Sequence, residues 1–135
     1  METTLFNKDG DSVAYISDDY NRTIYLWDGS PVAYLYNGQH VYGINGRHLG
    51  RFFNDIIYNS NGERIGFTAG TCPVSIAKES VKAKKQSMDE IRSRWDAPPS
   101  PRLRYVLAGQ DLVDFLKEGQ VARFRSEASP EESQD

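Results

Sequence analysis

Residues 24–33 read Ile24-Tyr25-Leu26-Trp27-Asp28-Gly29-Ser30-Pro31-Val32-Ala33, and three other stretches of the chain follow the same pattern. Each has an aliphatic and an aromatic residue, two free positions, Asp or Asn followed by Gly, two more free positions, and then an aliphatic and a small residue. The other copies begin at Leu5, Val41 and Ile57. A short period that recurs four times indicates a repeat architecture.

Each copy predicts a β-hairpin, because its centre is an Asp-Gly or Asn-Gly pair between two apolar segments. These pairs favour a two-residue type I′ turn, in which both residues need positive φ. We therefore expect Tyr25 opposite Val32 and Ile24 opposite Ala33, with the same pairing in the other copies. The small residue would let a neighbouring hairpin approach closely. The structural turn residues are then Gly10, Gly29, Gly46 and Gly62.

The fold class follows from the weakness of a single hairpin. Such a hairpin is marginally stable in water, so the four copies must bury their apolar faces against one another. The linkers between them are too short for a crossover helix, which places neighbours in sequence order. The sequence predicts a mainly β fold in which residues 1–74 form four consecutive β-hairpin repeats in a pseudo-fourfold, flower-like arrangement, with a C-terminal helical or irregular extension.

The runs from Trp27 to Tyr34 and from Gly46 to Gly50 carry a resemblance to a known family. They are similar to the four-fold beta flower proteins, a bacterial family, and the resemblance covers about residues 5–74. It extends weakly to residues 111–116. It implies a fold and no catalytic residues. One departure is Arg51, at a place where many relatives have a tryptophan.

The second half of the chain predicts four further segments. Apolar residues at helical spacing indicate an amphipathic basic helix or arm over residues 75–96. Three prolines make residues 97–102 a linker. Residues 103–125 predict a strand plus a short helix that docks on the repeats, with Asp111 as its N-cap. Residues 126–135 hold four acids and no large apolar side chain, so we expect a disordered tail.

Charge and hydropathy exclude several classes of function. The chain has 16 basic and 19 acidic residues, a net charge of −3, which argues against nucleic acid and acidic membranes as partners. Residues 78–104 carry 8 basic and 4 acidic side chains, a mixture typical of a solvated face. No apolar run is long enough to span a membrane, and the start of the chain lacks the features of a signal peptide, so we expect a cytoplasmic protein.

Residues with reactive side chains form no known catalytic or metal-binding motif. His40, His48 and Cys72 do not have the spacing of metal ligands, and we expect the two histidines on different parts of the third hairpin. Cys72 has no active-site signature around it and is interpreted as a packing residue at a turn. The sequence predicts no metal, no cofactor and no catalytic residue.

Five residues remain as binding candidates: Trp27, Tyr34, Tyr36, Arg47 and His48. Aromatic rings beside polar turns suit flat ligands, and the adjacent basic pair suits an anionic one, although packing and solvation are the more common explanations of both. The leading hypothesis is a non-enzymatic β-repeat binding or accessory module with a protein partner. The alternative is a small-ligand-binding protein or enzyme with a pocket at the hairpin hub or near the basic pair. The oligomeric state is left open.

Overall fold

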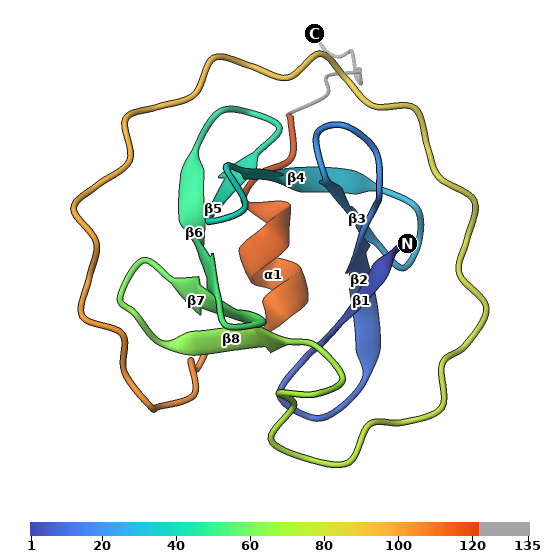
Figure 1. Cartoon of the computed structure of the whole chain (residues 1–135). Helices are drawn as coiled ribbons and strands as arrows, with labels where there is room; N and C mark the ends of the chain where they lie inside the picture. The colour runs from blue at the N-terminus through green and yellow to red at the C-terminus, as the bar shows by residue number, and fades with distance from the viewer. Residues whose placement is uncertain (122–135) are drawn as a thin grey trace, which may run out of the picture.

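The computed structural model describes residues 1–121 of the chain, which form eight strands and one helix (Figure 1). The elements are β1 (Thr3–Phe6), β2 (Ser12–Ile16), β3 (Thr23–Leu26), β4 (Pro31–Tyr36), β5 (His40–Gly43), β6 (His48–Phe53), β7 (Ile56–Asn59), β8 (Arg64–Phe67) and α1 (Leu112–Lys117). Each strand pairs antiparallel with the next one, and the sheet closes into a barrel.

The predicted mainly β fold of four consecutive hairpins is confirmed. The hairpins are β1–β2, β3–β4, β5–β6 and β7–β8, and they follow one another around the barrel in sequence order. β8 meets β1 through Phe67 and Phe6. The closure removes the free sheet edges that would otherwise pair with other chains. Within the described residues, no helix has the length and apolar character needed to cross a membrane.

One of the two predicted cross-strand pairs in each hairpin is correct, and the pair next to the turn is wrong. Ile24 lies opposite Ala33, as expected, but Tyr25 lies opposite Pro31 rather than Val32. The loop has three residues instead of two: Gly29 N–H donates to Leu26 O at 2.9 Å, and Gly29 has a φ of +92°. A type I turn followed by a left-handed glycine produces a bulge that moves the register by one residue. The other hairpins contain the same shift, which pairs Phe6 with Ser12, Tyr42 with His48 and Tyr58 with Arg64.

The interior of the barrel is filled by the first aliphatic residue of each repeat. These residues are Leu5, Ile24, Val41 and Ile57, all fully buried. The small residues opposite them allow close approach, as predicted, since a Cβ at Gly50 would meet the Tyr58 carbonyl of the next hairpin. Buried aliphatic side chains therefore occupy the hub.

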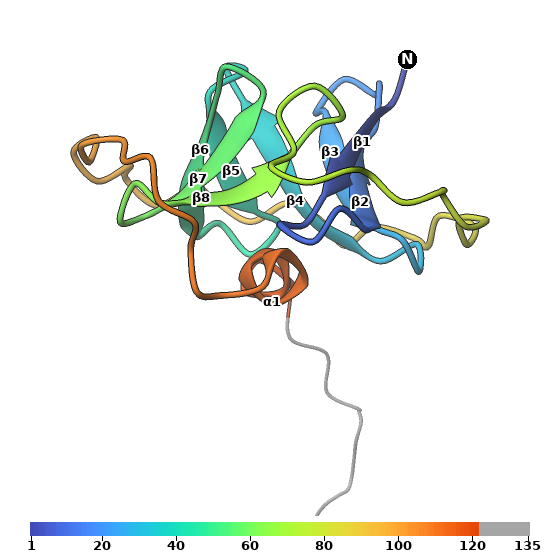
Figure 2. The ribbon, with the colours of Figure 1, turned by 90° about the horizontal axis from the view of Figure 1, so that it is seen from below.

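Helix α1 lies beneath one end of the barrel (Figure 2). Its sequence explains its bounds, because the Asp111 carboxylate accepts a hydrogen bond from Val113 N–H at 3.0 Å and caps the first turn. Three of its side chains face the barrel at helical spacing and join the core cluster: Leu112, Phe115 and Leu116. The short docking helix predicted from the sequence is present, with Gly119 just beyond its end.

Residues 74–109, called the belt from here on, run around the outside of the barrel in an extended conformation (Figure 1). The helix expected over residues 75–96 is wrong, and the alternative of an arm is the one observed. One belt N–H donates to the turn glycine carbonyl of each hairpin, at 2.8–2.9 Å. The pairs are Ala77 with Gly10, Gln86 with Gly29, Trp95 with Gly46 and Arg104 with Gly62.

The belt is extended because the hairpin turns are far apart. Its bonded residues recur every nine positions, one unit per hairpin, and nine residues span up to about 30 Å when extended but only about 14 Å in a helix. The predicted proline linker, residues 97–102, is part of the belt and lies between its third and fourth bonded residues, Trp95 and Arg104. The predicted strand after it is reduced to one bridge between Leu107 and Arg64. The predicted acidic tail, residues 126–135, lies outside the described residues.

Candidate functional site

The outer face of the barrel carries tyrosines that the belt covers. Their side chains alternate along the strands with those of the interior, so they point away from it. Tyr15, Tyr34 and Tyr42 are at most 4 % exposed. Basic side chains of the belt lie over tyrosine rings: the Lys82 ammonium is 4.2 Å from the Tyr15 ring centre, and the Arg94 guanidinium is 3.8 Å from that of Tyr36. The positive charge of the belt is therefore used partly in cation–π contacts with the barrel.

Trp27 belongs to the Tyr15 part of this face. Its ring meets that of Tyr15 edge-on, with 6.0 Å between centres. Its indole N–H donates to the Ser80 hydroxyl at 3.0 Å. The tryptophan thus fixes the belt to the second hairpin and lies in a different aromatic cluster from the other candidates.

Tyr34 and Tyr36 meet around Tyr42 on strands β4 and β5. The rings of Tyr34 and Tyr42 are stacked, with centres 6.1 Å apart. Tyr36 meets Tyr42 edge-on at 5.9 Å. A cavity of about 570 Å³ lies beside them, lined by Tyr36, Tyr42 and belt residues 91–97. Tyr36 therefore reaches this cavity, whereas Tyr34 is buried against Tyr42 and is not among its lining residues.

Arg47 and His48 do not act as the joint basic pair that their sequence suggests. Arg47 is exposed, and its guanidinium lies 5.8 Å from the ring centre of Trp95 in the belt. His48 packs edge-on against Tyr42, with 5.0 Å between ring centres. Arg47 lies in the turn before β6 and His48 is the first residue of β6, so the two side chains have different neighbours.

His40 and His48 are in contact, although we expected them on different parts of the hairpin. His40 Nδ1 lies 3.0 Å from His48 Nε2, a hydrogen bond between the two rings. The turn bulge is the cause, because it pairs His48 with Tyr42 and so brings it to the face that His40 already occupies. A strict two-residue turn would have left them on opposite faces.

Burial keeps this histidine pair uncharged at neutral pH. Desolvation lowers the pKa of His48 to about 4, and the nearby positive charge of Arg51 contributes in the same direction. The pKa of His40 is lowered for the same two reasons. Each ring then carries one proton, and one of these protons occupies the hydrogen bond between the rings. Among the described residues, His48 Nδ1 has no hydrogen-bond partner.

Next to the histidine pair lies a cavity of about 440 Å³ between the barrel and the belt, called the Phe53 cavity from here on. Its lining residues are Gln39, His40, Arg51, Phe52, Phe53, Ser100 and Leu103. Phe53 is 52 % exposed and Leu103 is 37 % exposed, so two large apolar side chains reach solvent at its walls. None of the lining residues is acidic.

Arg51 is the charged group of the Phe53 cavity. Its Nη2 donates to the belt carbonyl of Pro98 at 2.6 Å. Its Nη1 is buried and has no hydrogen-bond partner within residues 1–121, and no ion pair involves Arg51 in that part of the chain. A buried donor left unpaired costs about 1–3 kcal/mol, which makes this guanidinium a candidate for a ligand contact.

Sequence reasoning found His48 but missed its partners in the site. His40 and Arg51 are cross-strand neighbours on β5 and β6, but in the sequence His40 was considered only as a possible metal ligand and Arg51 only as a departure from the family pattern. The bulged register was the signal that could have joined them, because it places His40, His48 and Arg51 around one patch of the outer face. Phe53 and Leu103 could not have been paired from the sequence, since the belt brings them together.

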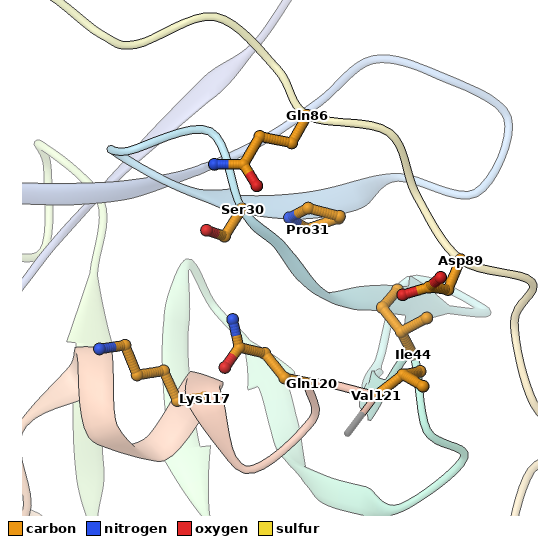
Figure 3. Close-up of a pocket in the computed structure, with 8 residues that line it drawn as sticks. All are labelled: Ser30, Pro31, Ile44, Gln86, Asp89, Lys117, Gln120 and Val121. Carbon is orange, nitrogen blue, oxygen red and sulfur yellow. The ribbon is translucent and has the colours of Figure 1, made fainter. Parts of the chain in front are cut away.

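A third cavity, of about 500 Å³, lies where the second hairpin, the belt and the end of α1 meet (Figure 3). It is lined by Ser30, Pro31, Ile44, Gln86, Asp89, Lys117, Gln120 and Val121. Gln86 and Gln120 extend toward Ser30 from opposite sides, while Lys117 points away from them (Figure 3). Its lining contains both an acid and a base, so it does not favour an ion of either sign. Within residues 1–121, no group of three or more His, Cys, Asp or Glu side chains is arranged to hold a metal ion.

Comparison with known proteins gives one positive result. A family model described as 4-fold beta flower protein matches residues 3–116 of the chain, which include the barrel, the belt and most of α1. No curated protein and no solved structure matches the chain.

Proposed function

The chain belongs to the 4-fold beta flower protein family, whose description names a fold, and we propose that this member is a non-enzymatic module that binds a segment of a partner protein at the Phe53 cavity. The observation that carries the proposal is the cavity itself, which is open, has apolar walls and is lined by a cationic group without an ion-pair partner in the described residues.

The surface around the cavity supports a protein partner. Beyond Leu103, the belt continues with Tyr105, Val106 and Leu107, which are 88 %, 41 % and 41 % exposed. Large apolar side chains that remain exposed in one stretch of the chain are typical of interaction sites. A partner segment would place one side chain in the cavity and pack its neighbours against this part of the belt.

A small molecule is the second candidate for the same site. The volume of about 440 Å³ falls in the range of small-molecule pockets. The earlier alternatives, a pocket at the hub or one formed by Arg47 and His48, are not carried into the proposal, because buried aliphatic side chains occupy the hub and the two basic side chains contact different rings. A cytoplasmic location is part of the proposal and is supported by the free thiol of Cys72, which suits a reducing compartment.

A displayed library of random peptides, selected against the intact full chain, tests the function. We expect enrichment of peptides that share an apolar side chain, and we expect Phe53→Ser to abolish their binding. Tyr20→Ser is the matched control, since Tyr20 is a 99 % exposed aromatic outside this cavity. Enriched peptides that bind both variants equally well, or a selection that enriches none, would contradict the proposed site.

A further inference from the structure

We propose that Arg51 and His40, which line the Phe53 cavity, form a carboxylate-binding subsite within it. The inference deepens the proposed function by naming the chemical group that this site recognises, and so it rests on the cavity being a binding site. The subsite takes a ligand with one carboxylate next to an aromatic or aliphatic body.

Arg51 supplies the charge of the subsite. A guanidinium has five N–H donors in a planar fork, and the bond to Pro98 O uses one of them at Nη2. The unpartnered Nη1 belongs to the same fork. A carboxylate accepts two parallel hydrogen bonds from such a fork, and these bonds are shorter and stronger than neutral ones. Arg51 lines the cavity, so a carboxylate bound there would meet this fork.

His40 supplies a second donor through the histidine pair. Its Nδ1 is engaged with His48 Nε2, which leaves its own Nε2 for a ligand. When His48 Nε2–H donates the hydrogen bond, His40 Nδ1 is the acceptor and carries no proton. The neutral His40 ring then has its proton on Nε2 and presents an N–H group there. A carboxylate in the cavity selects this tautomer. His48 Nδ1 is then an unprotonated nitrogen, which is buried and receives no hydrogen bond from the described residues.

The two donors are held in place before a ligand arrives. His40 and Arg51 are paired across β5 and β6, so the barrel fixes their spacing. The bond from Arg51 to Pro98 ties the guanidinium to the belt, and the ring contact between His40 and His48 fixes the imidazole. Donors that are positioned by strands rather than loops bind with little loss of conformational entropy.

The charge balance selects a carboxylate over a phosphate. The subsite offers one permanent positive charge, from Arg51, and a neutral imidazole. A singly charged carboxylate is matched by that guanidinium, whereas a doubly charged phosphate would leave charge uncompensated beside apolar walls. Those walls, formed by Phe52, Phe53 and Leu103, suit the hydrocarbon part of the ligand.

Titration of the ¹⁵N-labelled full chain with benzoate, followed by NMR, tests the subsite. Benzamide is the neutral isostere, and phenyl phosphate is the dianion. We expect benzoate to bind at least tenfold more tightly than either, and we expect Arg51→Gln to remove that preference. Arg51→Lys keeps the charge but loses the fork and should retain only part of it. The ¹⁵N signals of His40 should move to those of the Nε2–H tautomer on binding.

The outcomes separate this inference from the function on which it rests. Benzamide and benzoate that bind equally well, in the wild type and in Arg51→Gln, would overturn the subsite and leave the cavity as a binding site. If neither benzoate nor benzamide binds, both the subsite and the role of the cavity as a binding site are overturned. Tighter binding of phenyl phosphate would also contradict the carboxylate assignment. A peptide that ends in a free Phe carboxylate, compared with its amidated form and with benzoate, then shows whether the ligand is a chain terminus or a free acid.

Discussion

At Gly29, two constraints act on one residue of the hairpin turn. Its φ of +92° lies in the left-handed region, and a Cβ placed there would meet the backbone carbonyl oxygen of Lys84 in the belt. The turn glycines of the other three hairpins also face belt carbonyls, from Ser75, Ser93 and Arg102. Glycine is therefore required for the turn and also for the docking of the belt.

Gly29→Ala is expected to lower the free energy of unfolding by about 2–4 kcal/mol, because the new methyl group strains the turn and displaces the belt. Gly38→Ala is the matched control: Gly38 has a φ of +69°, but a Cβ there would meet nothing within 4 Å. We expect it to cost about 1 kcal/mol from backbone strain alone. Chemical denaturation of both variants measures the difference, and equal losses would contradict the role of the belt.

His48 gives the stability of the protein a pH dependence. The unfolded chain takes up a proton at this residue near pH 6.5, whereas the folded chain does so only near pH 4. The unfolded state thus binds more protons between these values, so the free energy of unfolding should fall by about 2 kcal/mol as the pH decreases from 6.5 to 4, with allowance for solvent screening.

The measurement for this prediction is urea denaturation at several pH values in the wild type and in His48→Gln. The variant cannot be protonated at this position, so its stability should decline less steeply between pH 6.5 and 4. An unchanged slope would show that other groups control the pH dependence. The carboxyl groups of Glu2, Asp18 and Asp28, whose pKa values are lowered by hydrogen bonds, contribute at the acidic end of the range in both proteins.

At the scale of elements, the belt is a repeat that matches the barrel by its backbone. Its nine-residue units use one N–H each to bond a turn glycine carbonyl, and the side chains at these positions differ from unit to unit: Ala77, Gln86, Trp95 and Arg104. A contact made by the main chain places little demand on the side chain. The nine-residue period is therefore regular in the backbone hydrogen bonds, but no repeated residue type marks it in the sequence.

Amide hydrogen exchange should reveal this period. We expect slow exchange at Ala77, Gln86, Trp95 and Arg104, whose N–H groups are bonded to turn carbonyls. The residues that directly follow them should exchange faster, since their N–H groups make no backbone hydrogen bond to the barrel within residues 1–121. These controls are Lys78, Ser87, Asp96 and Tyr105. Uniform exchange along residues 74–109 would show that the belt opens as easily at the turns as between them.

At the scale of the whole molecule, the barrel depends on parts of the chain outside the repeats. The belt covers the outer tyrosines, and α1 closes one end of the interior. Both elements bury apolar surface that the four hairpins would otherwise expose to water. The repeats form the closed sheet, while the second half of the chain completes its hydrophobic core.

A chain that ends at residue 74 should therefore lose fixed tertiary structure. Without the belt and α1, Tyr15, Tyr34 and the interior residues at the open end of the barrel become exposed. We expect reduced near-ultraviolet circular dichroism and increased binding of a hydrophobic dye relative to the full chain. Cooperative unfolding of the truncated chain at the temperature of the intact protein would show that the barrel is stable by itself.

The sequence by itself determined the local features of this protein. Asp-Gly and Asn-Gly pairs between apolar segments predicted the four hairpins, because turn chemistry and alternation act over a few residues. Asp111 and the apolar stripe after it predicted α1 for the same reason. The error in the turn was one residue, but it changed the face of His48 and so concealed its contact with His40.

Only the tertiary structure decided the path of residues 75–109 and the composition of the candidate site. A segment that bonds through its main chain to distant turns has no side-chain signature, and the helical spacing of its apolar residues was accordingly misleading. The Phe53 cavity joins Phe53 on β6 to Leu103 in the belt, which are 50 positions apart. Contacts of this range depend on how the barrel closes and on where the belt passes over it, and both result from the packing of the whole chain.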